Sequence, residues 1–255
     1  MTKNRSWVAV IVLLVLTDST RSFAQAPAPD KKPAWEKSAS VGLTLTRGNS
    51  ETLLATANIL AAKKRERNEL SLGVDGTYGE TKLPGATNST KNAESLHGFV
   101  QYNRLLTGRF YGYGRVDALH DAVADIEYRL TFSPGAGYYF IKNENTKLSA
   151  EVGPAFIYEK IGSADEHGYF TLRVAERFEQ KISDRARLWQ SAEFLPQVDD
   201  LDNYLINAEL GIEADLTKDK KLALRSFIQD TYDNEPAPGR KKNDLKWVTA
   251  IAYKF

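Results

Sequence analysis

Three histidines, His97, His120 and His167, are the residues whose chemistry could most readily support catalysis or metal binding. No two of them have the i, i+2 or i, i+4 spacing that brings two imidazoles to one metal ion. Hydrogen-bonded or solvated histidines are therefore the favoured interpretation. The chain contains no cysteine, which excludes a disulfide framework, a thiolate metal site and a lipid-modified cysteine. We expect neither a metal nor a cofactor.

A hydrolase would require a serine and a histidine on the same face of the fold. Ser133 is the serine nearest to His120 on the next predicted strand. Because side chains alternate along a strand, His120 is expected to point outward and Ser133 inward. A hydrolase resembling the outer-membrane phospholipases is therefore the third-ranked hypothesis, and we expect no enzyme.

Charged residues form a larger set of candidates, since they share the inward face of the predicted strands. They could neutralise one another in a closed core, or line a charged passage for ions or small polar solutes. Both interpretations stay open, and in the first we expect Glu151 to pair with its neighbours Arg129, Arg173 and Arg177. The inward set comprises Asp75, Arg115, Asp117, Glu127, Arg129, Glu151, Arg173, Arg177, Glu193, Glu209, Glu213, Arg225 and Lys246.

Inward glycines favour the passage, because they leave space that larger side chains would close. These glycines are Gly42, Gly73, Gly79, Gly135, Gly137, Gly153 and Gly211.

The dominant apolar period from Trp35 onward is two, which indicates β-strands. In "YRLTFSPGAGYYF" (128–140), for example, apolar residues alternate with small and polar ones. Each segment has about the ten residues that a tilted transmembrane strand needs. Pro134 and Pro154 each remove a hydrogen-bond donor, so we expect bulges there. The predicted strands are 36–47, 52–62, 69–80, 93–104, 110–120, 127–140, 147–159, 169–181, 187–197, 203–216, 221–232 and 244–255.

Short polar connections alternate with longer, turn-rich ones, as in outer-membrane barrels. If the first strand rises from the periplasm, the outward aromatic residues separate into two groups at opposite ends of the strands. Amphipathic rings settle at the two interfaces of a membrane, so these groups predict two aromatic girdles. The periplasmic girdle comprises Tyr102, Phe110, Tyr138, Phe140, Phe178, Tyr253 and Phe255. The opposite girdle comprises Tyr78, Tyr128, Phe156, Tyr158, Phe170, Tyr204, Tyr232 and Trp247.

These patterns predict an all-β protein, a transmembrane antiparallel up-and-down β-barrel of about twelve strands with both termini in the periplasm. Closure leaves no unpaired strand edge in the hydrocarbon. The barrel is expected over residues 35–255.

The N-terminal residues predict export. Lys3 and Arg5 precede the apolar run "WVAVIVLLVL" (7–16), and small residues follow it. This run is too short to span a bilayer and is typical of a cleaved signal peptide, here 1–24, which we favour over an uncleaved anchor. Residues 25–34 read as a Pro-rich linker.

The whole chain has a net charge of +1, and residues 1–24 contribute +2, so the mature chain is near −1. This charge gives no support for nucleic-acid binding.

The hairpin "SASVGLTLTRGNSETLLATANI" (38–59), the stretch 128–140 and the aromatic terminus resemble the salt-induced outer-membrane proteins of Gram-negative bacteria, a barrel family grouped as a domain of unknown function. The turn Gly48-Asn49-Ser50 is the most specific part of this resemblance. Phe255 is similar to the terminal aromatic residue that the barrel-assembly machinery reads. The resemblance implies a compartment but no established activity.

We therefore expect an integral outer-membrane barrel, either a narrow channel linked to salt or osmotic response or a closed structural or surface-interaction barrel. Outer-membrane lipid, lipopolysaccharide and the barrel-assembly machinery are the expected partners. The sequence does not determine the oligomeric state.

Overall fold

The computed structural model describes residues 35–46, 51–83 and 85–255. They contain no helix long and apolar enough to cross a membrane. The predicted signal peptide and linker, and the turn 48–50, lie outside the described residues. The twelve strands are β1 (Trp35–Thr46), β2 (Glu51–Arg65), β3 (Asn68–Lys82), β4 (Thr90–Leu105), β5 (Phe110–Asp121), β6 (Ile126–Lys142), β7 (Thr146–Ile161), β8 (His167–Ser183), β9 (Ala186–Pro196), β10 (Tyr204–Asp215), β11 (Leu222–Asp233) and β12 (Asn243–Lys254).

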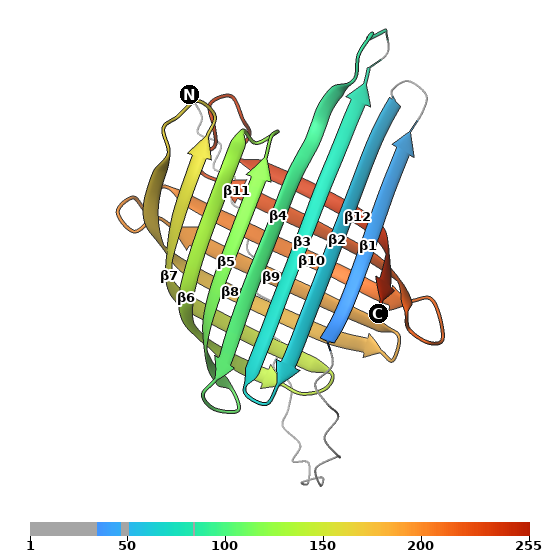
Figure 1. The fold of residues 1–255 in the computed structure, drawn as a ribbon, viewed down its shortest axis with the longest axis vertical. Helices are drawn as coiled ribbons and strands as arrows, with labels where there is room; N and C mark the ends of the chain where they lie inside the picture. Colours follow the sequence, from blue (N-terminus) through green and yellow to red (C-terminus); the bar gives the residue numbers. More distant parts are fainter. Residues whose placement is uncertain (1–34, 47–50, 84) are drawn as a thin grey trace, which may run out of the picture. The chain divides into compact units, whose positions relative to one another are not determined.

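The twelve strands form a closed antiparallel barrel, which confirms the predicted fold class. Each strand pairs with its neighbours in sequence, and β1 pairs with β12 to complete the ring. In Figure 1, β1 to β5 form the near wall and β8 to β11 cross behind them. The closing seam is short: β1 and β12 pair from Ser38–Lys254 to Val41–Ile251, whereas β1 and β2 pair along the whole of β1.

Alternation of side chains sets the two faces of the wall. On β6, Leu130 and Phe132 are exposed on the outside, whereas Arg129 and Ser133 are buried inside. A strand directs successive side chains to opposite faces, so a segment that alternates apolar and polar residues yields an apolar exterior and a polar interior. This is the reverse of the arrangement in a water-soluble barrel.

The two ends of the barrel differ in their connections. One end, the short-turn rim, carries connections 66–67, 106–109, 143–145, 184–185 and 216–221 together with the C-terminus. The other end, the long-loop rim, carries connections 83–89, 122–125, 162–166, 197–203 and 234–242 among the described residues. Figure 1 shows the loop between β3 and β4 rising well above the neighbouring strands.

The bulges predicted at Pro134 and Pro154 are not found. The β6–β7 register is the same on both sides of the prolines, with Phe132 opposite Phe156 and Ala136 opposite Val152. Since this register places the two prolines opposite each other, the ladder omits hydrogen bonds there without inserting a residue. The register shifts of the barrel lie elsewhere, for example between Ile126 and Tyr128.

Candidate functional site in the barrel lumen

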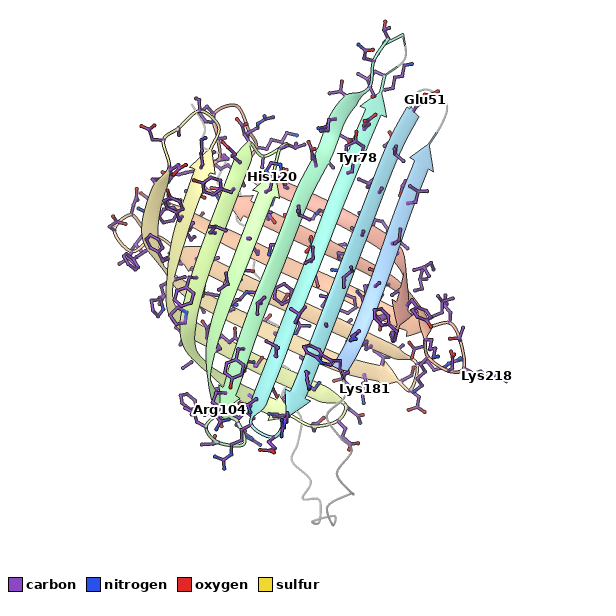
Figure 2. The ribbon with its side chains drawn as sticks, viewed as in Figure 1. Glu51, Tyr78, Arg104, His120, Lys181 and Lys218 are labelled. Atoms are coloured by element: carbon purple, nitrogen blue, oxygen red, sulfur yellow. The ribbon has the colours of Figure 1, made fainter. Side chains whose placement is uncertain are left out.

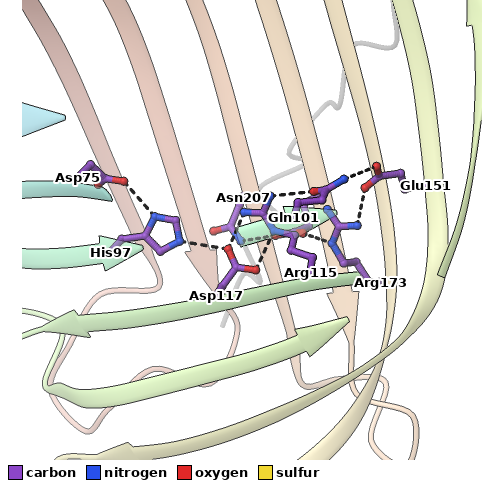
Figure 3. Close-up of polar contacts among 9 residues, drawn as sticks. Asp75, His97, Gln101, Arg115, Asp117, Glu151, Arg173 and Asn207 are labelled. Carbon is purple, nitrogen blue, oxygen red and sulfur yellow. Dashed lines mark hydrogen bonds and ion pairs between the residues drawn. The ribbon is translucent and has the colours of Figure 1, made fainter. Parts of the chain in front are cut away.

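A continuous chain of polar contacts crosses the inside of the barrel (Figure 3). We call it the lumen chain. Its nine residues come from β3, β4, β5, β7, β8, β9 and β10. In order of contact they are Asp75, His97, Asp117, Arg115, Gln101, Glu151, Arg173, Glu193 and Asn207.

The first half of the lumen chain joins three neighbouring strands. His97 lies between two carboxylates, with Nδ1 3.0 Å from Asp75 Oδ1 and Nε2 3.2 Å from Asp117 Oδ1. Arg115 donates from Nε to Asp117 Oδ2 at 2.7 Å and from Nη1 to Gln101 Oε1 at 3.1 Å. Each of these side chains is directed inward by its position on its strand.

The second half of the lumen chain meets at Glu151. Its Oε1 accepts hydrogen bonds from Gln101 Nε2 at 2.8 Å and from the Tyr111 hydroxyl at 3.0 Å. Its Oε2 accepts from Arg173 Nη1 at 2.8 Å. Arg173 also bonds Glu193 through Nε, so this arginine joins two carboxylates. Charge-assisted bonds of this kind hold buried charges in fixed positions.

A second cluster surrounds Glu213 near the short-turn rim. Its side chain is 1% exposed and is contacted by Arg187 at 3.1 Å, Arg225 at 2.7 Å and Lys254 at 2.8 Å. Arg225 also lies 3.4 Å from Asn58 Oδ1 on β2. Three cations around one buried carboxylate compensate its desolvation.

Glu209 and Lys246 differ from these clusters, because neither forms an ion pair among the described residues. Glu209 accepts from the Trp189 indole and, at 2.8 Å, from Gln229 Nε2. Lys246 Nζ reaches Thr77 Oγ1 on β3 at 3.2 Å. Glu209 is therefore a carboxylate held only by neutral donors.

The structure corrects one predicted inward position and two predicted pairings. Glu127 is 57% exposed and contacts Lys160 at 2.7 Å, because the register shift beside it removes it from the inward row. Arg177 shares the inward parity of Arg173 on β8, but it is 57% exposed and bonds Glu179 at 2.9 Å rather than Glu151. Arg129 faces inward but does not pair with Glu151.

Arg129 instead pairs with Glu159, its cross-strand partner, and with Asp233 at 3.1 Å. Asp233 lies on β11, so this ion pair crosses the lumen from β6. Of the three arginines expected to pair with Glu151, only Arg173 does so.

The inward glycines do not leave the open space that the sequence suggested. A Cβ on Gly137 would lie 2.3 Å from the Tyr111 ring, and one on Gly211 would lie 2.2 Å from the Trp189 ring. Gly135 is covered in the same way by Tyr113. Inward aromatic rings therefore occupy the surface above these glycines and narrow the lumen.

These rings are inward-facing residues of the candidate site that the sequence analysis missed. Tyr111, Tyr113, Tyr139 and Trp189 all occupy buried inward positions. The sequence did contain a signal for two of them. On β5, Tyr111 and Tyr113 lie one and three residues after the outward-facing Phe110, so the alternation of side chains predicts that they face inward. Their pairing with glycines required the cross-strand register, which places Tyr111 opposite Gly137 and Tyr113 opposite Gly135.

In the part of the chain that the structure describes, no group of three or more His, Cys, Asp or Glu side chains is arranged to hold a metal ion. His120 is exposed, with Nδ1 2.8 Å from the Glu127 carbonyl oxygen, whereas Ser133 is fully buried on the inside. His167 Nε2 lies 3.5 Å from Glu159 at the long-loop rim. The wall therefore separates the only serine and histidine considered for hydrolysis.

The predicted girdle residues lie at or near the outer surface, several in ring pairs. At the long-loop rim the pairs are Tyr128–Tyr158, Phe156–Phe170 and Tyr204–Tyr232, with centroids 5.0–6.0 Å apart. The Tyr158 hydroxyl donates to Glu166 in the adjoining loop and lowers the pKa of that carboxyl. Tyr78 and Trp247 are exposed without such pairs (Tyr78 is labelled in Figure 2).

At the short-turn rim, Tyr138 pairs with Phe140 at 5.2 Å and Tyr253 with Phe255 at 6.1 Å. Tyr102 and Phe110 are exposed, and Phe178 is half-buried. Leu, Val and Ile side chains occupy the exposed surface between the two groups.

Comparison with known proteins supports the fold. Over residues 39–255 the chain matches the family described as "Protein of unknown function, DUF481". No curated protein matches the chain. NanC porin is 6% identical, with a TM-score of 0.52 over 86% of this chain and 100% of the porin. An outer-membrane channel from Pseudomonas putida F1 is 11% identical, with a TM-score of 0.51 over 91% and 100%. At these identities the likeness establishes the outer-membrane barrel fold alone.

Proposed function

This chain belongs to the DUF481 family of proteins of unknown function, and we propose that it is an outer-membrane barrel that conducts ions or small polar solutes through a narrow lumen. The observation that carries the proposal is the lumen chain, in which carboxylates contact His97, Arg115 and Arg173 and the neutral Gln101 joins the two halves. Rings of fixed charge inside a water-filled barrel select ions by sign and size.

The exterior supports membrane insertion. Exposed Val74, Val100, Phe132 and Leu210 would contact hydrocarbon, and closure of the barrel satisfies the strand hydrogen bonds. We propose that the signal peptide directs export, that the barrel-assembly machinery inserts the chain, and that both termini face the periplasm. The long loops would then face lipopolysaccharide. The two similar structures are named as a porin and a channel, which agrees with conduction here.

The resemblance to salt-induced proteins extends the proposal to ionic strength. We propose that the barrel conducts under salt or osmotic stress. The Arg129–Asp233 pair near the long-loop rim is not its sensor, because Arg129 is only 8% exposed and salt screens buried ion pairs much less than exposed ones.

A closed structural or surface-interaction barrel is the second candidate, and a specific observation favours it. The Tyr111, Tyr113 and Trp189 rings cover inward glycines, and ion pairs span the interior. A lumen packed in this way would serve as a rigid core.

The deciding experiment is single-channel recording of the purified, refolded barrel in a planar bilayer. We expect discrete conductance steps with a measurable preference for cations or anions. Heat-modifiable migration on a gel should first establish that the sample is folded. Folded protein that produces no conductance steps at any applied voltage would establish the closed barrel instead.

A further inference from the structure

Among outward-facing strand positions near the short-turn rim, cations are confined to one side of the barrel. Lys37 lies on β1, Lys63 and Arg65 lie on β2, and Arg104 lies on β4. Arg104 is labelled at this rim in Figure 2. On the described strands β5 to β11, the outward positions near this rim carry uncharged residues, including Phe110, Phe140, Ile182 and Leu222.

The register makes these four cations one continuous strip. Lys63 is opposite Leu70, which is opposite Tyr102. Arg65 is opposite Asn68, which is opposite Arg104. Side chains directly opposite each other on one face of a sheet are neighbours. The basic strip is our name for this surface, which comprises the cations Lys37, Lys63, Arg65 and Arg104 together with Trp35, Asn68, Leu70, Tyr102 and Phe255.

Aromatic rings are interleaved with the cations of the basic strip. Lys63 Nζ lies 5.4 Å from the Trp35 ring centroid, and Lys37 Nζ lies 5.8 Å from that of Phe255. Both distances are within the range of cation–π attraction.

A second contact orders the other end of the basic strip. Arg104 Nη1 and the Tyr102 hydroxyl both donate to Asn68 Oδ1, at 2.7 and 2.6 Å. This shared acceptor holds the guanidinium beside the phenol ring.

None of the four cations forms an ion pair with a carboxylate among the described residues, in contrast to the inward arginines. Glu36 and Glu66 are the nearest carboxylates in sequence, but neither contacts a strip cation within salt-bridge distance. The strip therefore presents uncompensated positive charge at the level where rings of the outer surface meet the membrane interface.

We propose that the basic strip binds the headgroup of an anionic phospholipid in the adjoining leaflet. Lys37, Lys63, Arg65 and Arg104 would contact the phosphate, while the Trp35, Tyr102 and Phe255 rings lie at the level of the glycerol and upper acyl chains. Basic residues next to a membrane attract anionic lipid in this way. The site lies on the outer wall and is independent of conduction through the lumen.

The test is native mass spectrometry of the folded barrel released from detergent micelles that contain either phosphatidylglycerol or phosphatidylcholine. We expect phosphatidylglycerol adducts to persist on the wild type and phosphatidylcholine adducts to be lost. Lys37→Gln with Lys63→Gln should reduce the phosphatidylglycerol preference by about thirtyfold, as expected for two lost interfacial charges. Arg65→Gln with Arg104→Gln should reduce the phosphatidylglycerol preference to a similar extent. This second double variant keeps the test decisive if the first one fails to fold.

The matched control is Lys181→Gln with Lys218→Gln, which removes the same charge from the same rim outside the basic strip (Figure 2). This pair should retain the wild-type preference. Excess inorganic phosphate should not displace the lipid, because it has no glycerol or acyl chain to contact the aromatic rings. Equal binding of the two lipids by the wild type, an equal loss in the control pair, or displacement by phosphate would each overturn the proposal.

Discussion

The backbone amide of Phe255 donates a hydrogen bond to the carbonyl oxygen of Lys37, at 3.1 Å. This bond joins the last residue of the chain to the first strand. The Phe255 side chain is 60% exposed and its ring lies 6.1 Å from that of Tyr253. The C-terminal residue is therefore part of the barrel seam, although β12 ends at Lys254.

Replacing Phe255 by Asp should reduce assembly of the barrel in the outer membrane. The substitution puts a charge at the membrane interface and removes the terminal aromatic residue that an assembly factor would read. The measurement is the fraction of heat-modifiable protein in outer-membrane extracts, with unassembled chain recovered from the periplasm. Phe140→Asp is the control, since it changes a 54% exposed ring at the same rim without touching the terminus. Equal losses in both variants would mean that Phe255 acts only as an anchor.

The proposed topology predicts which loops reach the cell surface. A cysteine at Asn88, in the long loop after β3, should react with a membrane-impermeant thiol reagent on intact cells. A cysteine at Glu144, in the short turn after β6, should react only after the outer membrane is permeabilised. The native chain has no cysteine, so labelling reports the introduced site alone. The reverse pattern would require the barrel to be inverted.

Glu151→Gln removes the carboxylate that Arg173 and two neutral donors share. In a sealed lumen we expect a loss of about 3–5 kcal/mol in unfolding free energy, because a buried cation loses a partner. In an open lumen water would replace the lost partner, and the expected effect is altered conductance with a shift towards anions. Urea unfolding of the refolded protein and planar-bilayer recording separate the two results.

Glu209→Gln is the matched comparison, because Glu209 is held by Trp189 and Gln229 rather than by a cation. We expect it to alter selectivity in an open lumen as Glu151→Gln does, but to cost clearly less stability. If the two variants lose the same stability, the ion pair with Arg173 is not the source of the loss.

The inward rings predict a steric effect at the glycines beneath them. Gly137→Val and Gly211→Val would place atoms against the Tyr111 and Trp189 rings, and each should destabilise the barrel by about 1–3 kcal/mol through overpacking. Gly114→Ala serves as the control, since nothing lies within 4 Å of its Cβ position. Unfolding midpoints in urea measure the difference. Wild-type stability in both valine variants would show that the rings are free to move away.

The sequence by itself determined the features that depend on one strand at a time. Alternation of apolar and polar residues is local, because successive side chains point to opposite faces whatever the neighbouring strand does. It was therefore sufficient to predict twelve strands, a closed barrel, and the inward direction of residues such as Arg173 and Glu213. It failed at Glu127, where a register shift changes parity.

Only the tertiary structure decided which inward groups meet. Pairing depends on register between strands and on reach across the lumen, and neither is encoded in the alternation of a single strand. Arg173 forms an ion pair with Glu151. Arg129 instead forms ion pairs with Glu159 and, across the barrel, with Asp233. Register also decides whether an inward glycine leaves open space. From the sequence alone Gly137 is expected to leave a gap in the wall, but the register places it opposite Tyr111, whose ring covers it.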